Sequence, residues 1–254
     1  MIILDGRSLS QEIINTLKTK DLSSLSLHII LVGDDPNSQK YVELKQKRCV
    51  EIGLKCIVHR LPTDTTEVTI TELTNKLNND ITVSGYFIQL PMPSFLNKES
   101  IISTINPQKD VDGLTENSPY TPAAVRGVIS LLNKYQLTFA EKNAVIINDS
   151  KLIGIPLKNI LEKENCHVEV CNEFTQNIQK ISRGADYLFS ATGVKGLITR
   201  DYIKQGAVVI DIGGGDVDFT DVSPLCSYIT PTVGGVGPMT IACLLQNLVD
   251  NTTQ

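Results

Sequence analysis

The feature that most restricts the possible folds is a series of short, almost continuous apolar runs, each four to six residues long. Runs of this length without a polar alternation are typical of strands that are buried on both faces of a sheet. We predict seven strands, over residues 27–32, 56–61, 85–90, 144–147, 167–171, 186–191 and 207–212.

Helical periodicities lie between these runs. Apolar residues recur at helical spacing at Ile13, Ile14 and Leu17; at Leu73 and Leu77; at Val128, Leu131 and Leu132; and at Leu157, Ile160 and Leu161. Ser8 and Gln11 match a capping box at a helix start, and Gly53 is expected to end a helix after Ile52. Regular alternation of strand and helix predicts an α/β fold with parallel sheets and right-handed crossovers.

The length of 254 residues fits either one large α/β unit or two domains of about 100–150 residues each. The pattern of strands and helices lapses over residues 106–122, a segment rich in Asn, Asp, Pro and Gly. We therefore predict a first domain over residues 1–121 and a second over 122–237. The C-terminal segment 238–254 contains a last helix, which we expect to pack back on the first domain.

Charge and hydropathy exclude several classes of function. Net charge is −5, and no basic run is longer than "KQKR" at 45–48, so the sequence predicts binding to neither nucleic acid nor an anionic membrane surface. The N-terminal apolar run is too short for a signal peptide, and no stretch approaches the ~18 apolar residues that span a bilayer. A small-molecule partner is expected.

Six cysteines form no CxxC pair, and only three histidines could join them as metal ligands. We expect free thiols in a reducing cytoplasm and no metal site.

Several side chains could carry chemistry in the first domain. Tyr41 and Lys45 are separated by one turn of a helix predicted to start at Pro36, so both lie on one face. A tyrosine ring can stack on a flat heteroaromatic ligand, and a partly buried lysine can act as an acid or a base. A solvated lysine beside a half-packed tyrosine is the alternative interpretation of this pair alone.

Two further signals follow strands of the same domain. Gln89 stands at the carboxyl edge of a predicted strand, where open α/β sheets bind ligands, or it merely caps the loop. Asp110 and Asp112 lie in the loop "KDVDG", which forms either an Asx-turn or a carboxylate site for the donor edge of an amino-heterocycle.

A β-α-β-α-β run over residues 143–212 has the organisation of a dinucleotide site. Gly154 allows close backbone approach, and Pro156 fits the first position of the following helix. The next strand ends before Asn172 and Glu173, in the window where an acidic side chain binds the ribose hydroxyls of NAD. A surface glutamate at a strand end is the alternative.

Four motifs in this order and spacing, "GDDPNSQKYVELK", "QLPMP", "KDVDG" and "GGVGPMTIACLL", make the chain resemble the bifunctional methylenetetrahydrofolate dehydrogenase/methenyltetrahydrofolate cyclohydrolase family over nearly its whole length. The resemblance implies a homodimer of two-domain α/β chains, with folate bound in a cleft between an N-terminal catalytic domain and a Rossmann-like domain. It implies oxidation of 5,10-methylenetetrahydrofolate with NAD(P)+ and hydrolysis of the methenyl product to 10-formyltetrahydrofolate, two steps of one-carbon metabolism.

The resemblance also assigns roles to residues. Lys45 matches the catalytic lysine, Gln89 the glutamine that supports it, Asp112 the carboxylate that holds the pterin, and Tyr41 the ring that stacks on folate. Further expected substrate contacts are Ser38, Gly234, Gly235 and Pro238. The expected cofactor contacts are Asn148, Asp149, Ser150, Gly154, Pro156, Asn172, Glu173, Thr192, Gly193 and Ile212.

Three departures from the family pattern bear on the cofactor. Where the family has G-R-S or G-A-S, this chain has Asn148, Asp149 and Ser150, and Asn172 with Glu173 replaces a His followed by Ser or Arg. The loop before "GDVDF" is also shortened. The first two changes remove groups suited to a 2′-phosphate and add carboxylates, so we expect NAD as the cofactor, with NADP as the alternative; the shorter loop bears on the cofactor contacts that the family makes there.

The primary hypothesis is therefore a bifunctional, NAD-preferring oxidoreductase and hydrolase. The alternatives are a cyclohydrolase whose dehydrogenase site has decayed and a non-catalytic nucleotide- or folate-sensing module.

Overall fold

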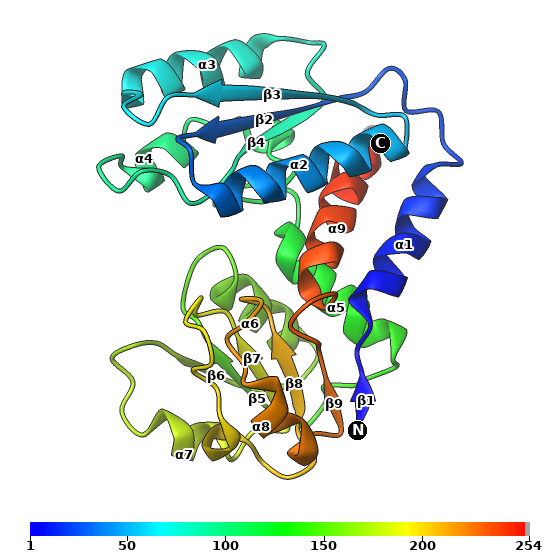
Figure 1. Cartoon of the computed structure of the whole chain (residues 1–254), viewed down its shortest axis with the longest axis vertical. Coiled ribbons are helices and arrows are strands. Elements are labelled where there is room, and N and C mark those ends of the chain that lie inside the picture. Colours follow the sequence, from blue (N-terminus) through cyan, green and yellow to red (C-terminus); the bar gives the residue numbers. More distant parts are fainter. Residues whose placement is uncertain (252–254) are drawn as a thin grey trace. The chain divides into compact units, whose positions relative to one another are not determined.

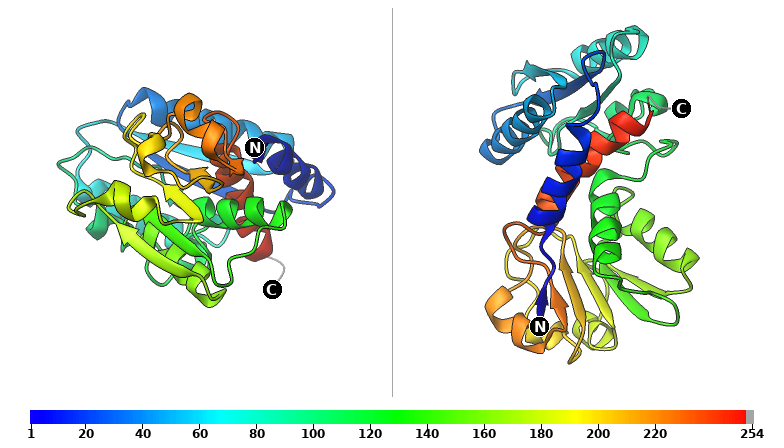
Figure 2. Two further views of the ribbon diagram at one scale, coloured as in Figure 1. Left: turned by 90° about the horizontal axis from the view of Figure 1, so that it is seen from below. Right: turned by 90° about the vertical axis from the view of Figure 1, so that its right-hand side faces the viewer.

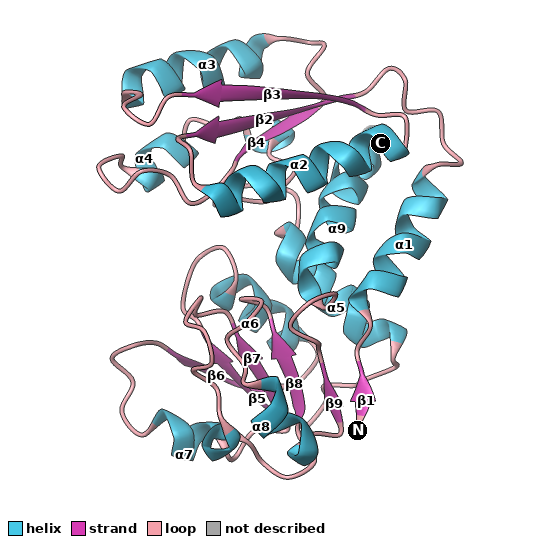
Figure 3. Cartoon of the chain, in the orientation of Figure 1, coloured by secondary structure: helices cyan, strands magenta, loops and turns pink. Residues whose placement is uncertain are grey.

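The structure, a computed structural model, describes residues 1–251 and contains two compact units. The six-stranded unit comprises Met1–Gln11 and Ala124–Thr240, and the three-stranded unit comprises Glu12–Ala123 and the chain from Ile241. Each unit is a parallel sheet with helices on both faces, as the ribbon and its colouring by secondary structure show (Figures 1 and 3). The predicted α/β class is confirmed.

The three-stranded unit has the strand order β3-β2-β4, with β2 (Ser26–Val32) in the centre between β3 (Lys55–Leu61) and β4 (Gly85–Ile88). Side chains of β2 alternate between two cores. Leu27, Ile29 and Leu31 pack with α2 (Pro36–Glu51) and with the C-terminal part of α9 (Val236–Asn251). Ile30 and Val32 pack with the helices of the other face. Those helices are α3 (Glu67–Asn79) and α4 (Lys98–Ile102), and the turn η1 (Pro107–Lys109) follows them.

The six-stranded unit has the order β1-β9-β8-β7-β5-β6, and every neighbouring pair is parallel. Its central strands are β5 (Asn143–Ile147), β7 (Tyr187–Ser190) and β8 (Val208–Asp211), and its outer strands are β6 (His167–Cys171), β9 (Tyr228–Ile229) and β1 (Ile2–Ile3). One face is covered by α5 (Ala123–Lys134) and α6 (Gly154–Lys163), and the other by α7 (Ile178–Ser182), η2 (Arg200–Tyr202), α8 (Phe219–Val222) and η3 (Ser223–Leu225).

Strand order in this sheet reverses at β5, because β6 lies on one side of it and β7 on the other. In doubly wound sheets such a reversal opens a crevice at the carboxyl ends of the strands, where nucleotides bind. The predicted Rossmann-like organisation is confirmed.

The first eleven residues lie in the six-stranded unit, whereas our predicted bounds placed them in the first domain. The reason is β1, which pairs with β9 through Ile2–Tyr228 and Ile3–Ile229 and is seen beside it in two views (Figures 1 and 2). Two strands of two residues carry no readable periodicity. Helix α1 (Gly6–Leu17) then leads into the three-stranded unit.

Two local predictions were wrong. Ser8 lies inside α1, and its backbone N–H is accepted by the Asp5 carboxylate at 3.0 Å, so Asp5 and not Ser8 caps the helix. Pro156 is the third and not the first residue of α6. It is tolerated there because the N–H groups of the first turn have no partner within the helix.

Candidate active site

Lys45 occupies a core-facing position on α2. The buried residues of this helix are Ser38, Val42, Lys45 and Cys49, which follow one stripe at helical spacing. Only 3% of the Lys45 side chain is exposed. A lysine at such a position is rare unless it is paired, which makes it a candidate for chemistry.

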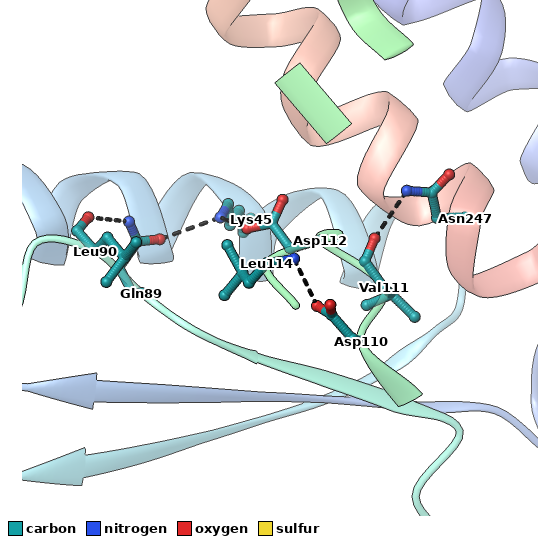
Figure 4. A network of polar contacts seen from close by, with 8 residues as sticks. All are labelled: Lys45, Gln89, Leu90, Asp110, Val111, Asp112, Leu114 and Asn247. Carbon is teal, nitrogen blue, oxygen red and sulfur yellow. Dashed lines mark hydrogen bonds and ion pairs between the residues drawn. The ribbon is translucent and has the colours of Figure 1, made fainter. Parts of the chain in front are cut away.

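Two polar groups surround the Lys45 ammonium (Figure 4). Lys45 Nζ donates to Gln89 Oε1 at 3.1 Å and lies 3.9 Å from Asp112 Oδ2. Gln89 Nε2 donates to the carbonyl oxygen of Leu90 at 2.6 Å, so the amide oxygen must face the lysine. The structure therefore brings together the three residues predicted to be catalytic.

Aromatic rings complete the environment of Lys45. Its Nζ lies 3.9 Å from the centroid of the Phe87 ring and 4.9 Å from that of Tyr41. Sequence reasoning missed Phe87. The signal was available, because Phe87 precedes Gln89 by two residues on one extended segment and so points to the same side of it.

Burial acts on both charges of the cluster. It lowers the pKa of Lys45, and the negative charge of Asp112 offsets part of that effect. Burial likewise raises the pKa of Asp112, and the Lys45 charge offsets part of that. The lysine is therefore displaced toward its neutral form, which can accept a proton.

The structure separates the roles of the two aspartates in "KDVDG". Asp110 is fully buried and accepts three hydrogen bonds within its own loop, from Leu114 N at 3.0 Å and from Thr115 N and Oγ1 at 2.7 Å each. Those bonds occupy its oxygens in holding the loop. Asp112 is the aspartate that reaches Lys45.

Ser38 lies two helical turns before Lys45 on the same stripe of α2. Its backbone N–H is capped by Asp35 Oδ1 at 2.7 Å, but its buried Oγ has no hydrogen-bond partner within the described residues. Buried hydroxyls are usually paired, so this oxygen is available to a ligand.

In the six-stranded unit, a pocket of about 610 Å³ opens at the carboxyl ends of β5, β6 and β7. Its lining includes Ile147, Asn148, Asp149, Cys171, Asn172, Glu173, Thr175, Ile178, Ala191, Thr192, Val194, Leu197 and Tyr202. The location is the crevice where doubly wound folds bind nucleotides, and the volume suits a nucleoside.

The loop after β5 is organised by the side chain of Asn148. Asn148 Oδ1 accepts from Ser150 N, Ser150 Oγ and Gly154 N at 3.0, 2.6 and 3.1 Å, and its Nδ2 donates to Ala191 O at 2.8 Å. A Cβ at Gly154 would lie 1.8 Å from the carbonyl oxygen of Asn148, so only glycine fits. The side-chain amide of Asn148 therefore holds the conformation of this loop, as a glycine-rich turn does in other dinucleotide-binding folds.

Two acidic side chains line the pocket. Asp149 Oδ2 accepts from Asn172 Nδ2 at 2.8 Å, which ties the loop after β5 to the loop after β6. Glu173 follows Asn172 and is exposed. The lining contains these two carboxylates and neither Lys nor Arg.

The other predicted cofactor residues lie near two buried aspartates that sequence reasoning missed. Thr192 donates from N and Oγ1 to Asp216 Oδ2 at 2.6 and 2.9 Å, and Gly193 follows with φ of 70°. Ile212 begins the shortened loop, whose Gly214 and Gly215 N–H groups each lie 2.8 Å from the Asp211 carboxylate. The short loop is thus held by its own side chains.

Gly234, Gly235 and Pro238, predicted to contact substrate, belong to the six-stranded unit and its α9 start. Gly234 has φ of 96°, and its carbonyl accepts from Arg7 N at 2.8 Å. A Cβ at Gly6 would lie 1.9 Å from the Gly235 carbonyl oxygen. Close packing against the chain start therefore fixes this turn.

Together these features define a class: two-domain α/β enzymes with a nucleotide-binding unit and a separate buried lysine centre. The family profile described as tetrahydrofolate dehydrogenase/cyclohydrolase, catalytic domain, matches residues 4–112, and the NAD(P)-binding domain profile of the same family matches 122–254. The chain belongs to the tetrahydrofolate dehydrogenase/cyclohydrolase family, which confirms the resemblance.

Individual relatives agree along the whole chain. The bifunctional protein FolD of Thermodesulfovibrio yellowstonii is 41% identical, with 97% of this chain and 95% of that protein covered. The crystal structure of the bifunctional enzyme FolD from Campylobacter jejuni has 38% identity and a TM-score of 0.93, covering 100% and 99% of the two chains. The Trypanosoma brucei enzyme, solved with NADP and an inhibitor, has 28% identity and a TM-score of 0.93, covering 99% and 97%.

Within residues 1–251, no helix has the length and hydropathy needed to cross a membrane. All six cysteines are free thiols. Over the same residues, no three potential metal-binding side chains gather into a cluster.

Proposed function

We propose that this chain oxidises 5,10-methylenetetrahydrofolate with NAD+ and hydrolyses the resulting 5,10-methenyltetrahydrofolate to 10-formyltetrahydrofolate. The observation that carries the proposal is the buried Lys45, hydrogen-bonded to Gln89 and 3.9 Å from Asp112. The bifunctional descriptions of the relatives support this activity, and not a cyclohydrolase alone or a sensing module.

Hydrolysis requires a base beside a cation. The methenyl group is an amidinium-like cation, so water can attack its bridging carbon when a neutral amine takes up the released proton. The bond from that carbon to N5 then breaks as N5 gains a proton and the new hydroxyl loses one, which leaves the formyl group on N10. Lys45 is that base, since burial lowers its pKa and a bound cation lowers it further. Gln89 Oε1 directs the amine, Asp112 accepts hydrogen bonds from the pterin, and Tyr41 stacks on the folate ring.

The nucleotide fits the pocket at the reversal of strand order. The turn ordered by Asn148 and the close approach of Gly154 to it hold the loop after β5 at the edge of this pocket. NAD+ supplies the hydride acceptor, while the protein contributes position and a dry surrounding.

We propose NAD over NADP because of the charge on the pocket. A 2′-phosphate at the adenosine ribose would meet Asp149 and Glu173 with no Lys or Arg in the lining to neutralise it. The Asn172 hydrogen bond keeps the Asp149 carboxylate at this edge. Free ribose hydroxyls can donate to the same carboxylates, so one arrangement favours NAD and repels NADP.

Steady-state kinetics with both nucleotides test the preference. We expect a higher kcat/KM with NAD, and an Asp149→Ser/Glu173→Ser double variant should raise kcat/KM for NADP by roughly ten- to a hundredfold, since each carboxylate costs on the order of 1 kcal/mol. Glu169→Gln is the matched control, because Glu169 lies on β6 outside the pocket lining. A wild-type enzyme more efficient with NADP contradicts the preference.

We further propose that the enzyme is a homodimer that acts in the cytoplasm. The family resemblance supports the dimer, and six free thiols suit a reducing compartment. Light scattering coupled to size-exclusion chromatography tests the dimer, and a monomeric mass at micromolar concentration contradicts it.

A further inference from the structure

Asn247 on α9 is buried and donates from Nδ2 to two backbone carbonyls. The acceptors are Val111 O at 2.9 Å and Thr121 O at 3.1 Å, and the first bond is drawn in Figure 4. A carboxamide nitrogen carries two hydrogens. Both are therefore engaged, and the two acceptors are ten residues apart in the sequence.

These two carbonyls bracket the segment that carries Asp112. Val111 directly precedes Asp112, and Thr121 lies two residues before Ala123. The backbone N–H of Ala123 donates to the carbonyl oxygen of Asp112 at 3.1 Å, so this segment begins and ends at the same place. Asn247 thus pins together the two ends of the loop formed by residues 112–121. Within this loop, the backbone N–H groups of Leu114 and Thr115 donate to the Asp110 carboxylate.

The pinned loop sets the distance between Asp112 and Lys45. Their 3.9 Å separation exceeds a direct hydrogen bond, so the backbone position of the loop, more than a bond between the side chains, determines where the carboxylate stands. A shift of the loop changes both the contact that Asp112 offers to a ligand and its effect on the lysine.

We propose that Asn247 is a positioning residue for the folate reaction, which holds the 112–121 loop so that Asp112 faces Lys45 and the bound pterin. The inference rests on the proposed role of Asp112. Asn247 itself touches neither substrate nor cofactor in this scheme. It acts through the backbone on both sides of the carboxylate.

The test is Asn247→Ala, measured for both activities. Loss of the pin should raise KM for both folate substrates about tenfold, the effect of roughly one weakened charged hydrogen bond. KM for NAD should not change, because the nucleotide pocket belongs to the six-stranded unit.

A pH profile separates positioning from a general loss of stability. Burial lowers the pKa of Lys45, and Asp112 raises it, as do the Cys49 and Cys56 thiols to a smaller extent. If the distance between Lys45 Nζ and Asp112 Oδ2 grows by about 1 Å, the carboxylate stabilises the ammonium less. At an effective dielectric constant near 20, the acidic limb of the cyclohydrolase pH profile should then shift to lower pH by roughly half a unit. A merely structural residue would lower the melting temperature and leave the limb and KM in place.

Asn251→Ala is the matched control. Asn251 lies one turn later on α9 and makes the same kind of bond, from Nδ2 to Gln108 O at 3.0 Å, but it joins the chain before Asp110. We expect wild-type KM values and a wild-type pH profile from this variant.

Asn247→Gln is a second test variant, for the case that Asn247→Ala does not fold. It keeps the amide but moves both donors by about one methylene, so it should shift KM and the pH limb in the same directions by a smaller amount. Wild-type folate KM values together with a wild-type acidic limb of the pH profile, in whichever of the two Asn247 variants folds, would overturn the inference. Absence of folate activity in the wild type would instead refute the proposed function.

Discussion

Replacing Gly154 by alanine should damage the nucleotide unit and leave the lysine centre working. An ideal Cβ at this position lies 1.8 Å from the carbonyl oxygen of Asn148, whereas real contacts of this kind are not shorter than 3.0 Å. The backbone must therefore separate by about 1.2 Å, the difference between those two distances. Such a shift also breaks the 3.1 Å hydrogen bond from Gly154 N to Asn148 Oδ1.

The expected magnitude follows from these two effects. Overpacking of this size costs about 1–3 kcal/mol, and the lost hydrogen bond adds about 1 kcal/mol. At about 2–4 °C per kcal/mol for a chain of this size, the melting temperature should fall by roughly 5–15 °C. A misplacement near 1 Å in a binding loop should also weaken NAD affinity or turnover by about a hundredfold.

Calorimetric titration with NAD and thermal melts measure these effects, and the chain has no tryptophan for an intrinsic fluorescence signal. Gly237→Ala is the control, because a Cβ there meets nothing within 4 Å. Cyclohydrolase activity well below the melting temperature should stay at the wild-type level, since Lys45 belongs to the other unit. Unchanged melting and NAD affinity in Gly154→Ala would refute the reasoning.

Two further predictions concern the three-stranded unit. Lys45→Met keeps a side chain of similar length and removes the base, so cyclohydrolase turnover should fall by about 10²–10⁴-fold while NAD affinity is retained; turnover within threefold of wild type would exclude the assigned role. Burial, and then the charge of His59, lowers the pKa of His28 from 6.5 to about 4. Between these two pH values the unfolded chain binds a proton at His28 that the folded chain does not, so the free energy of unfolding should drop as pH falls from 6.5 toward 4. Urea denaturation should show about 1–2 kcal/mol less stability at pH 5 than at pH 7 from this group, a difference that His28→Gln removes; an equally steep dependence in the variant contradicts it.

Local signals in the sequence were sufficient to predict most of the architecture. Buried parallel strands are nearly continuous apolar runs, so all seven longer strands could be recognised without knowledge of their neighbours. The two-residue strands are defined by their pairing, β1 with β9 across more than 200 residues and β9 also with β8, and no local pattern specifies such a pairing.

The same distinction applies to the candidate site. Lys45, Gln89 and Asp112 stand in recognisable motifs, and the structure brings them together. Asn247 and Asp211 act through hydrogen bonds to backbone groups, which any sequence can offer. Their importance depends on tertiary position, and a single sequence carries no sign of it.

The course of the chain through its two units limits how the protein can be divided. The unit boundaries fall after Gln11, Ala123 and Thr240, so the polypeptide passes from one unit to the other three times. A cut at the middle boundary leaves β1 on one fragment and its pairing strand β9 on the other, and it separates Asn247 from the loop that it pins. The C-terminal fragment therefore lacks one strand of the six-stranded sheet, and the N-terminal fragment keeps β2, β3 and β4 but lacks the part of α9 that packs on them. A chimera of two relatives joined at this boundary must therefore form the β1–β9 pairing and the Asn247 hydrogen bonds between segments taken from different parents.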